Sequence, residues 1–132
     1  MILIIDDDVF GVSPYKFALE DAGFGVTVVG NPDDALRVLK TNRAEIELIV
    51  LDILMPSGQR LSDSETSAGL ETGTVLFDLI RREFPSVPVV VFSITNSSGI
   101  KADHPTQLIL HKEDTLPKDL VEIVKSLRKK GA

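Results

Sequence analysis

Acidic side chains follow two of the apolar runs of this chain at the point where each run ends. Asp6, Asp7 and Asp8 come directly after the first run, and Asp52 comes directly after Ile46–Leu51. Taken singly, each has an ordinary explanation, because aspartate is common in turns. In open parallel α/β sheets, however, ligands bind just outside the carboxyl ends of the strands. The aspartates are therefore candidates for a ligand site as well as for turns.

A hydroxyl and an ammonium group follow two further apolar runs. Ser93 ends the run Val87–Phe92, and Lys112 comes shortly after Leu108–Leu110. Alone, Ser93 would be a turn residue and Lys112 a surface charge. The placement of polar groups at the ends of four runs favours a common site over independent turns.

Carboxylates brought to one edge of a sheet would repel one another by roughly 4 kcal/mol per pair at about 4 Å, in an effective dielectric of about 20. Either one acid stays protonated or a divalent cation binds. Ligands that are all oxygen suit Mg²⁺ better than zinc or copper. A metal, the Ser93 hydroxyl and the Lys112 ammonium together suit a phosphoryl group, whose oxygens carry negative charge. Asp52, alone after the central run, would be the nucleophile that becomes an aspartyl phosphate.

The elements that would position these groups alternate along the chain. The apolar runs read as strands at Met1–Ile5, Gly25–Val29, Ile46–Leu51, Val87–Phe92 and Leu108–Leu110. Segments with helical periodicity lie between them, which is typical of a parallel sheet with helices on both faces. We expect an α/β fold with a flavodoxin-like, doubly wound, five-stranded parallel sheet in the order 2-1-3-4-5. This order places the first and third strands side by side.

Local signals predict where the helices begin and end. Ser13 and Pro14 are expected to open the first helix, which Gly23 ends, and Asn31 with Pro32 opens the second. The remaining helices are expected at about Thr72–Glu83 and from near Pro117. Residues 94–106 lack a helical stripe, so the helix between the fourth and fifth strands is expected to be weak or missing.

Composition restricts the classes of function. The 132 residues suffice for one domain, and 43% hydrophobic and 26% charged residues are typical of a soluble globular protein. The absence of cysteine excludes disulfides and thiolate chemistry. A net charge of −6 disfavours nucleic acid as a direct partner. With no membrane span and no targeting pattern, a cytoplasmic location is expected.

With these residues in view, the chain resembles the receiver domain of two-component response regulators, which has a CheY-like fold. The resemblance covers residues 1–132 as a single domain. It rests on the acidic pair Asp6-Asp7, the Asp-x-x-Met-Pro signature from Asp52 to Pro56, Gly73 in the third helix, the Pro-led strand from Pro88 to Ser93, and Lys112.

The resemblance implies a phosphorelay switch. A histidine kinase or histidine phosphotransfer protein would pass its phosphoryl group to Asp52, and an unidentified downstream protein would read the changed surface. The domain would catalyse its own aspartyl phosphorylation and dephosphorylation, unlike a conventional enzyme. The family implies Mg²⁺ held by Asp7, Asp52 and the backbone carbonyl of Leu54, with Asp6 acting through water. Ser93 and Lys112 would contact the phosphoryl oxygens.

The chain also departs from the family pattern. Gly73 lies farther from Asp52 than usual, which indicates an inserted polar loop at about residues 57–70. Ile94 stands where the family prefers a small residue, and Ile109 where many members carry an aromatic switch residue. We expect a bulky Ile94 to narrow access to the phosphoryl site.

Two alternatives remain open. The insertion and Ile94 favour a phosphorylation-independent receiver-like module that only binds proteins. The second alternative is a phosphatase of the haloacid dehalogenase type, in which Asp6 would be the nucleophile and Asp8 the acid. The chain is short for that fold, and the hypothesis leaves Asp52 without a role.

Overall fold

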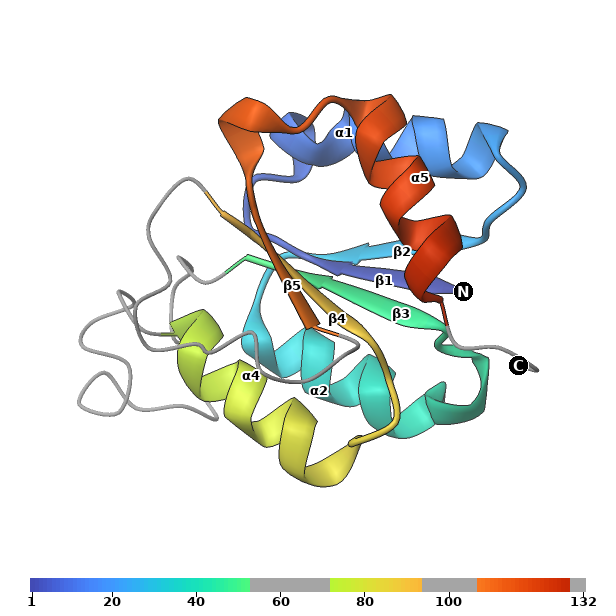
Figure 1. The fold of residues 1–132 in the computed structure, drawn as a ribbon. Helices are drawn as coiled ribbons and strands as arrows, with labels where there is room; N and C mark the ends of the chain where they lie inside the picture. The colour runs from blue at the N-terminus through green and yellow to red at the C-terminus, as the bar shows by residue number, and fades with distance from the viewer. Residues whose placement is uncertain (53–71, 94–106, 129–132) are drawn as a thin grey trace.

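Five parallel strands form a single sheet in the order β2-β1-β3-β4-β5, which confirms the expected fold class (Figure 1). The computed structural model describes residues 1–52, 72–93 and 107–128. The strands are β1 Ile2–Ile5, β2 Val26–Val29, β3 Leu48–Leu51, β4 Val89–Ser93 and β5 Gln107–His111. The chain is thus a doubly wound α/β protein, with β1 and β3 at the centre of the sheet.

Helices cover both faces of this sheet. They are α1 Val9–Asp21, α2 Pro32–Thr41, α4 Thr72–Glu83 and α5 Pro117–Leu127, with short 3₁₀ turns η1 Arg43–Glu45 and η2 Lys112–Asp114. In Figure 1, α1 and α5 lie on one face, and α2 and α4 on the other. The central strands are therefore covered by helices on both sides, and their side chains on both faces of the sheet must be apolar.

The central strand β1 shows why its sequence is apolar without alternation. Leu3 and Ile5 belong to the core beneath α2 and α4, whereas Ile2 and Ile4 belong to the core beneath α1 and α5. All four are buried. Because successive side chains of a strand point to opposite faces, a strand between two helical layers must be apolar at every position.

The expected start of α1 at Ser13-Pro14 is wrong, since the helix begins at Val9. The Asp8 carboxylate accepts a hydrogen bond from the backbone N–H of Gly11 at 3.0 Å and so caps the helix. The Ser13 hydroxyl instead bonds back to the Val9 carbonyl within the helix, at 2.9 Å. Pro14 lies on the exposed side of α1. Because proline has no N–H, the carbonyl four residues before it lacks its usual helical donor, and water can hydrate that carbonyl instead.

The other tested helix boundaries follow their local signals. Gly23 ends α1 with a φ of 97°, and the N–H groups of Gly23 and Phe24 donate to the carbonyls of Glu20 and Leu19 at 3.0 and 3.1 Å. This is a Schellman end, with Phe24 packed in the same core as Leu19. Asn31 caps α2 through the N–H of Asp34 at 2.8 Å. The final helix begins at Pro117, as expected.

Several expectations fall on parts of the chain outside the described residues. They concern the inserted loop at 57–70, the weak helix within 94–106, and the residues Leu54 and Ile94. The assignment of residues 1–132 to a single domain also stays a prediction. None of the helices within the described ranges is both long enough and apolar enough to cross a membrane.

Candidate functional site

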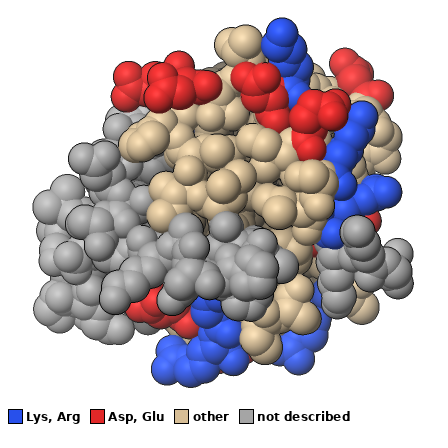
Figure 2. Space-filling view, in the orientation of Figure 1, with Lys and Arg blue, Asp and Glu red and all other residues tan. Residues whose placement is uncertain are grey.

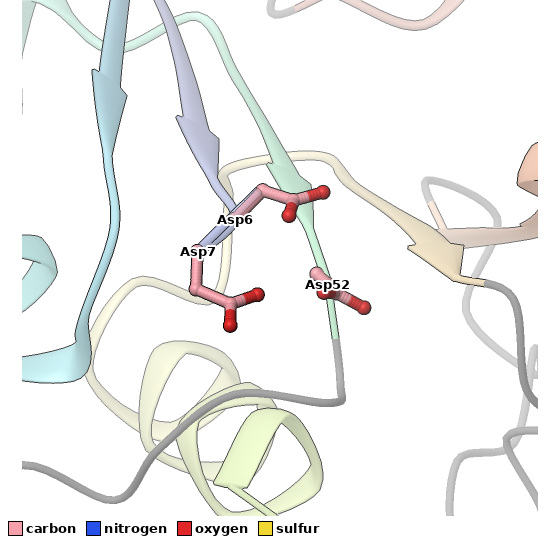
Figure 3. Close-up of side chains that lie close together, drawn as sticks. All are labelled: Asp6, Asp7 and Asp52. Atoms are coloured by element: carbon pink, nitrogen blue, oxygen red, sulfur yellow. The ribbon is translucent and has the colours of Figure 1, made fainter. Parts of the chain in front are cut away.

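The carboxyl ends of β1 and β3 bring Asp6, Asp7 and Asp52 together (Figure 3). Ile5 and Leu51 are partners in the parallel register, and the N–H of Asp52 donates to the Ile5 carbonyl at 2.9 Å. The aspartates therefore follow the last paired residues of two adjacent strands. One carboxylate oxygen from each lies within 4.8 Å of the others. Asp6 and Asp52 are buried, whereas Asp7 is exposed.

Lys112 supplies a cation to this acidic group. Its Nζ lies 2.6 Å from Oδ2 of Asp6 and 3.7 Å from Oδ2 of Asp52. The lysine follows β5 at the start of η2, so the fifth strand delivers it to the edge where β1 and β3 end. The nitrogen also lies 5.9 Å from the ring centre of Phe92, which is buried on β4.

The surroundings keep Lys112 charged. Burial by itself lowers the pKa of this ammonium, but the hydrogen bond to Asp6 and the charges of Asp52, Asp6 and Asp8 more than offset it, so that the pKa lies above the usual 10.5. The raised pKa follows from opposite charges at short range in a partly desolvated site. A permanent cation here can stabilise negative charge that develops next to Asp52.

The donor set fits a hard divalent cation. Among the described residues, three carboxylates and one ammonium lie together in this group, and a divalent cation would reduce the repulsion between the acids. All ligand atoms offered by the acids are oxygens, which suits Mg²⁺. An exposed ligand, Asp7, beside two buried ones also suits an ion that keeps part of its water shell.

Ser93 and Leu54 complete the predicted set only in part. β4 ends at Ser93, whose backbone pairs with His111, the residue before Lys112. Ser93 is therefore placed at the same edge of the sheet as the acids. The orientation of its side chain, and all of Leu54, lie outside the part of the chain that the structure describes.

One member of the acidic run has a role that the sequence reasoning missed. The sequence suggests that Asp8 is a turn residue or, in the phosphatase hypothesis, an acid. Its backbone N–H donates to Oδ1 of Asp6 at 2.9 Å, while its side chain caps α1. An aspartate directly before an apolar helical stretch is a capping signal, and it was available in the sequence.

The fold and the site together define a doubly wound α/β protein with an acidic cluster and a lysine at the strand ends. The chain belongs to the response regulator receiver domain family, whose family model matches residues 2–125. It is therefore a receiver domain of the kind found in two-component response regulators. The resemblance noted from Asp6, Asp7, Asp52 and Lys112 is thus confirmed at the level of the family.

Individual relatives agree with this assignment. The nitrogen assimilation regulatory protein NtrX of Azorhizobium caulinodans is 39% identical over 94 residues, which cover 70% of this chain and 17% of that protein. The chain thus spans less than a fifth of the length of that relative.

Solved structures share the fold. A response regulator receiver protein from Sinorhizobium medicae superposes with a TM-score of 0.71 at 27% identity, covering 96% of this chain and 91% of that one. The receiver domain of NtrX from Brucella abortus gives a TM-score of 0.72 at 24% identity, covering 96% and 97%. At 24% identity, the similarity to the Brucella abortus domain supports the fold alone.

Proposed function

We propose that this receiver domain is a phosphoacceptor switch in which Asp52 takes a phosphoryl group from a histidine kinase or a histidine phosphotransfer protein. The observation that carries the proposal is the buried Asp52 carboxylate, grouped with Asp6 and Asp7 and lying 3.7 Å from the Lys112 ammonium. Membership of the receiver family supports the same role. Asp6, Asp7 and Asp52 would hold Mg²⁺, together with the Leu54 carbonyl.

Asp52, Lys112 and Ser93 would each have a different role in the phosphoryl transfer. An oxygen of Asp52 attacks phosphorus while the bond to the donor nitrogen breaks. Lys112 neutralises charge on the phosphoryl oxygens, a contribution that Ser93 would extend with a hydrogen bond. When bound, Mg²⁺ would supply further charge neutralisation and orient the phosphoryl group. The burial of Asp6 and Asp52 keeps these interactions in a poorly hydrated setting, where they are stronger.

A surface on α1 suits contact with a protein phosphodonor. Val9, Phe10 and Phe17 on α1, and Leu116 before α5, are large apolar side chains exposed by 48, 92, 57 and 56%. We call these four residues the apolar α1 surface. The Tyr15 hydroxyl donates to the Thr115 carbonyl at 2.6 Å, which brings Leu116 beside α1. Phe10 and Phe17 lie seven residues apart and so share one side of α1, and exposed apolar side chains on one side of a helix are typical of a protein contact.

This surface lies close to the phosphoacceptor. Val9 and Phe10 begin α1 directly after the acidic run that supplies Asp6 and Asp7. A partner seated there would therefore bring its own phosphohistidine to the edge of the sheet. Figure 2 shows acidic side chains along the upper edge of the molecule with Lys and Arg side chains among them, in the region where α1 and α5 lie in Figure 1. A partner that offers apolar side chains would complement the apolar α1 surface.

We also propose that residues 1–132 form one receiver domain, that it works in the cytoplasm, and that a downstream protein reads the phosphorylated state. The family supports the signalling part of this proposal. Phosphorylation would add charge and acceptor oxygens beside Lys112, which would shift the domain between two states that the downstream partner distinguishes.

The deciding experiment is intact mass spectrometry after incubation with a small phosphodonor and Mg²⁺. We expect one phosphoryl adduct on the parent chain and none on Asp52→Asn or in the presence of a chelator. Asn has nearly the same shape as Asp but is a poor nucleophile, so the variant tests the chemistry and not the fold. If the folded parent took no phosphoryl group from either a small donor or a kinase, the phosphorylation-independent module would be the better description.

A further inference from the structure

Asp8 connects the acidic site to the beginning of α1 through two hydrogen bonds. Its backbone N–H donates to Oδ1 of Asp6 at 2.9 Å, and its carboxylate accepts from the N–H of Gly11 at 3.0 Å. The other oxygen of Asp6 lies 2.6 Å from Nζ of Lys112. The buried Asp6 carboxylate thus has one oxygen held by Asp8 and the other by a cation.

Gly11 provides the space that the Asp8 carboxylate occupies. A Cβ atom on residue 11 would lie 2.1 Å from Oδ2 and 2.6 Å from Cγ of Asp8, far inside contact distance. A Cβ atom at this position would force the carboxylate at the end of the Asp8 side chain to move from its place in the cap. Glycine is otherwise a poor residue for the first turn of a helix, so this close approach gives a physical reason for its presence.

We propose that Asp8 and Gly11 are positioning residues for the Asp6 carboxylate. The cap holds the backbone of residue 8 in place, and the N–H of that residue then fixes Oδ1 of Asp6. With Oδ1 held, the carboxylate plane is set and Oδ2 is presented to Lys112 and to the cation site. The part that concerns a cation rests on the proposed function, whereas the hydrogen bond between residues 8 and 6 does not.

The role differs from that of an acid that acts through its charge. The group that touches Asp6 is a backbone N–H, and the Asp8 side chain holds that N–H in place through the cap on α1, whereas its charge acts on Lys112 without a direct contact. Asparagine caps helices as well as aspartate does. Asp8→Asn should therefore preserve the arrangement, while Asp8→Ala and Gly11→Ala should lose it.

The test compares the parent with these three variants by amide NMR in the presence of a chelator, followed by titration with Mg²⁺ alone. An N–H that donates to a carboxylate resonates downfield and exchanges slowly. We expect both signatures for residue 8 in the parent and in Asp8→Asn, and neither in Asp8→Ala or Gly11→Ala. The Mg²⁺ affinity should fall about tenfold in the last two variants, at the low end of what partners of metal ligands contribute.

Gly11→Ala separates positioning from stability. This variant loses the cap but gains a better helix former, so its unfolding midpoint should stay close to that of the parent. A parent-like amide signal and a parent-like Mg²⁺ affinity in Asp8→Ala and Gly11→Ala would overturn the proposal. So would an Asp8→Asn variant as impaired as Asp8→Ala. If the parent itself bound no Mg²⁺, the proposed function would fall, and the amide signals would still decide the positioning role.

Discussion

At the scale of single residues, the site depends on one cation placed between two buried acids. Lys112 lies close to both Asp6 and Asp52, and its side chain is only 19% exposed. Removing one partner from such a group leaves buried charge without compensation, which costs more than the loss of an exposed ion pair. The lysine is thus important for stability even without a phosphoryl group.

The pH dependence of this contribution has a definite sign. The pKa of Lys112 is raised in the folded state, so its stabilising effect is complete below the usual value of 10.5 and is lost as the pH rises through the higher folded value. Lys112→Met should lower the free energy of unfolding at pH 7 by about 2 kcal/mol, as expected for a hydrogen bond between charged groups. Above pH 10.5 the difference from the parent should shrink.

Urea unfolding of both proteins with a chelator present, at neutral and at alkaline pH, measures this difference. Lys125→Met is a matched control, because the side chains of Lys125 and its partner Glu122 are 50 and 76% exposed. The control should change stability by no more than about 0.5 kcal/mol. A constant deficit for Lys112→Met from neutral to alkaline pH would show that the loss comes from packing and not from charge.

At the scale of elements, α1 carries two different roles on its two sides. Val12 and Leu19 are buried in the core beneath α1 and α5, whereas Phe10 and Phe17 are exposed. The helix is therefore apolar on more than the face that packs on the sheet. Its two ends are both fixed by local contacts, the Asp8 cap at the start and the Gly23 turn at the end.

The end of α1 gives a second prediction. Gly23 has a φ of 97°, a conformation in which a Cβ atom costs about 1–2 kcal/mol. Gly23→Ala should therefore lower the free energy of unfolding by about 1 kcal/mol, although open space surrounds the position. Gly25→Ala is the control, since it also has no atom within 4 Å of an added Cβ but does not have a positive φ. Equal effects of the two substitutions in denaturant titrations would contradict the assignment of the cost to backbone conformation.

At the scale of the whole molecule, the topology places Asp52, the proposed acceptor, and the apolar α1 surface at neighbouring positions. β1 supplies Asp6 and Asp7 at its end and leads directly into α1 (Figure 1). A phosphodonor protein that contacts α1 would therefore lie next to Asp52. In the proposed function, this arrangement would separate recognition of the partner from the chemistry of the phosphoryl transfer.

That separation is testable with one exposed aromatic residue. The donor in this test is a histidine phosphotransfer protein that phosphorylates the parent chain. Phe10→Ser should lower the rate of transfer from this donor by about tenfold or more, which is the cost of truncating an aromatic anchor at an interface. Reaction with a small phosphodonor should stay at the parent rate, because Phe10 is 92% exposed and contributes no group to the acidic site. Glu20→Ser, at the other end of α1, should change neither rate. Equal slowing with both donors would mean that Phe10 acts on the site and not on the partner.

Features that depend on nearby residues could be predicted from the sequence. The apolar run at Met1–Ile5 predicts a strand, Asn31 predicts the beginning of α2 and Gly23 predicts the end of α1, and the structure confirms all three. The same local signals do not decide where α1 begins, because both Asp8 and Ser13 are good caps. The choice between them depends on the close approach of the Asp8 carboxylate to Gly11, which a list of residues does not reveal.

The sequence by itself determined the fold class, the strand order and the identity of the acids at the strand ends, because alternating apolar runs and right-handed crossovers permit few topologies. Only the tertiary structure decided how those acids divide their roles. It buries Asp6, leaves Asp7 exposed, and brings Lys112 from the opposite end of the chain to within 2.6 Å of Asp6. The physical reason is that these relations depend on distances across the sheet, which the packing of five strands sets and local sequence does not.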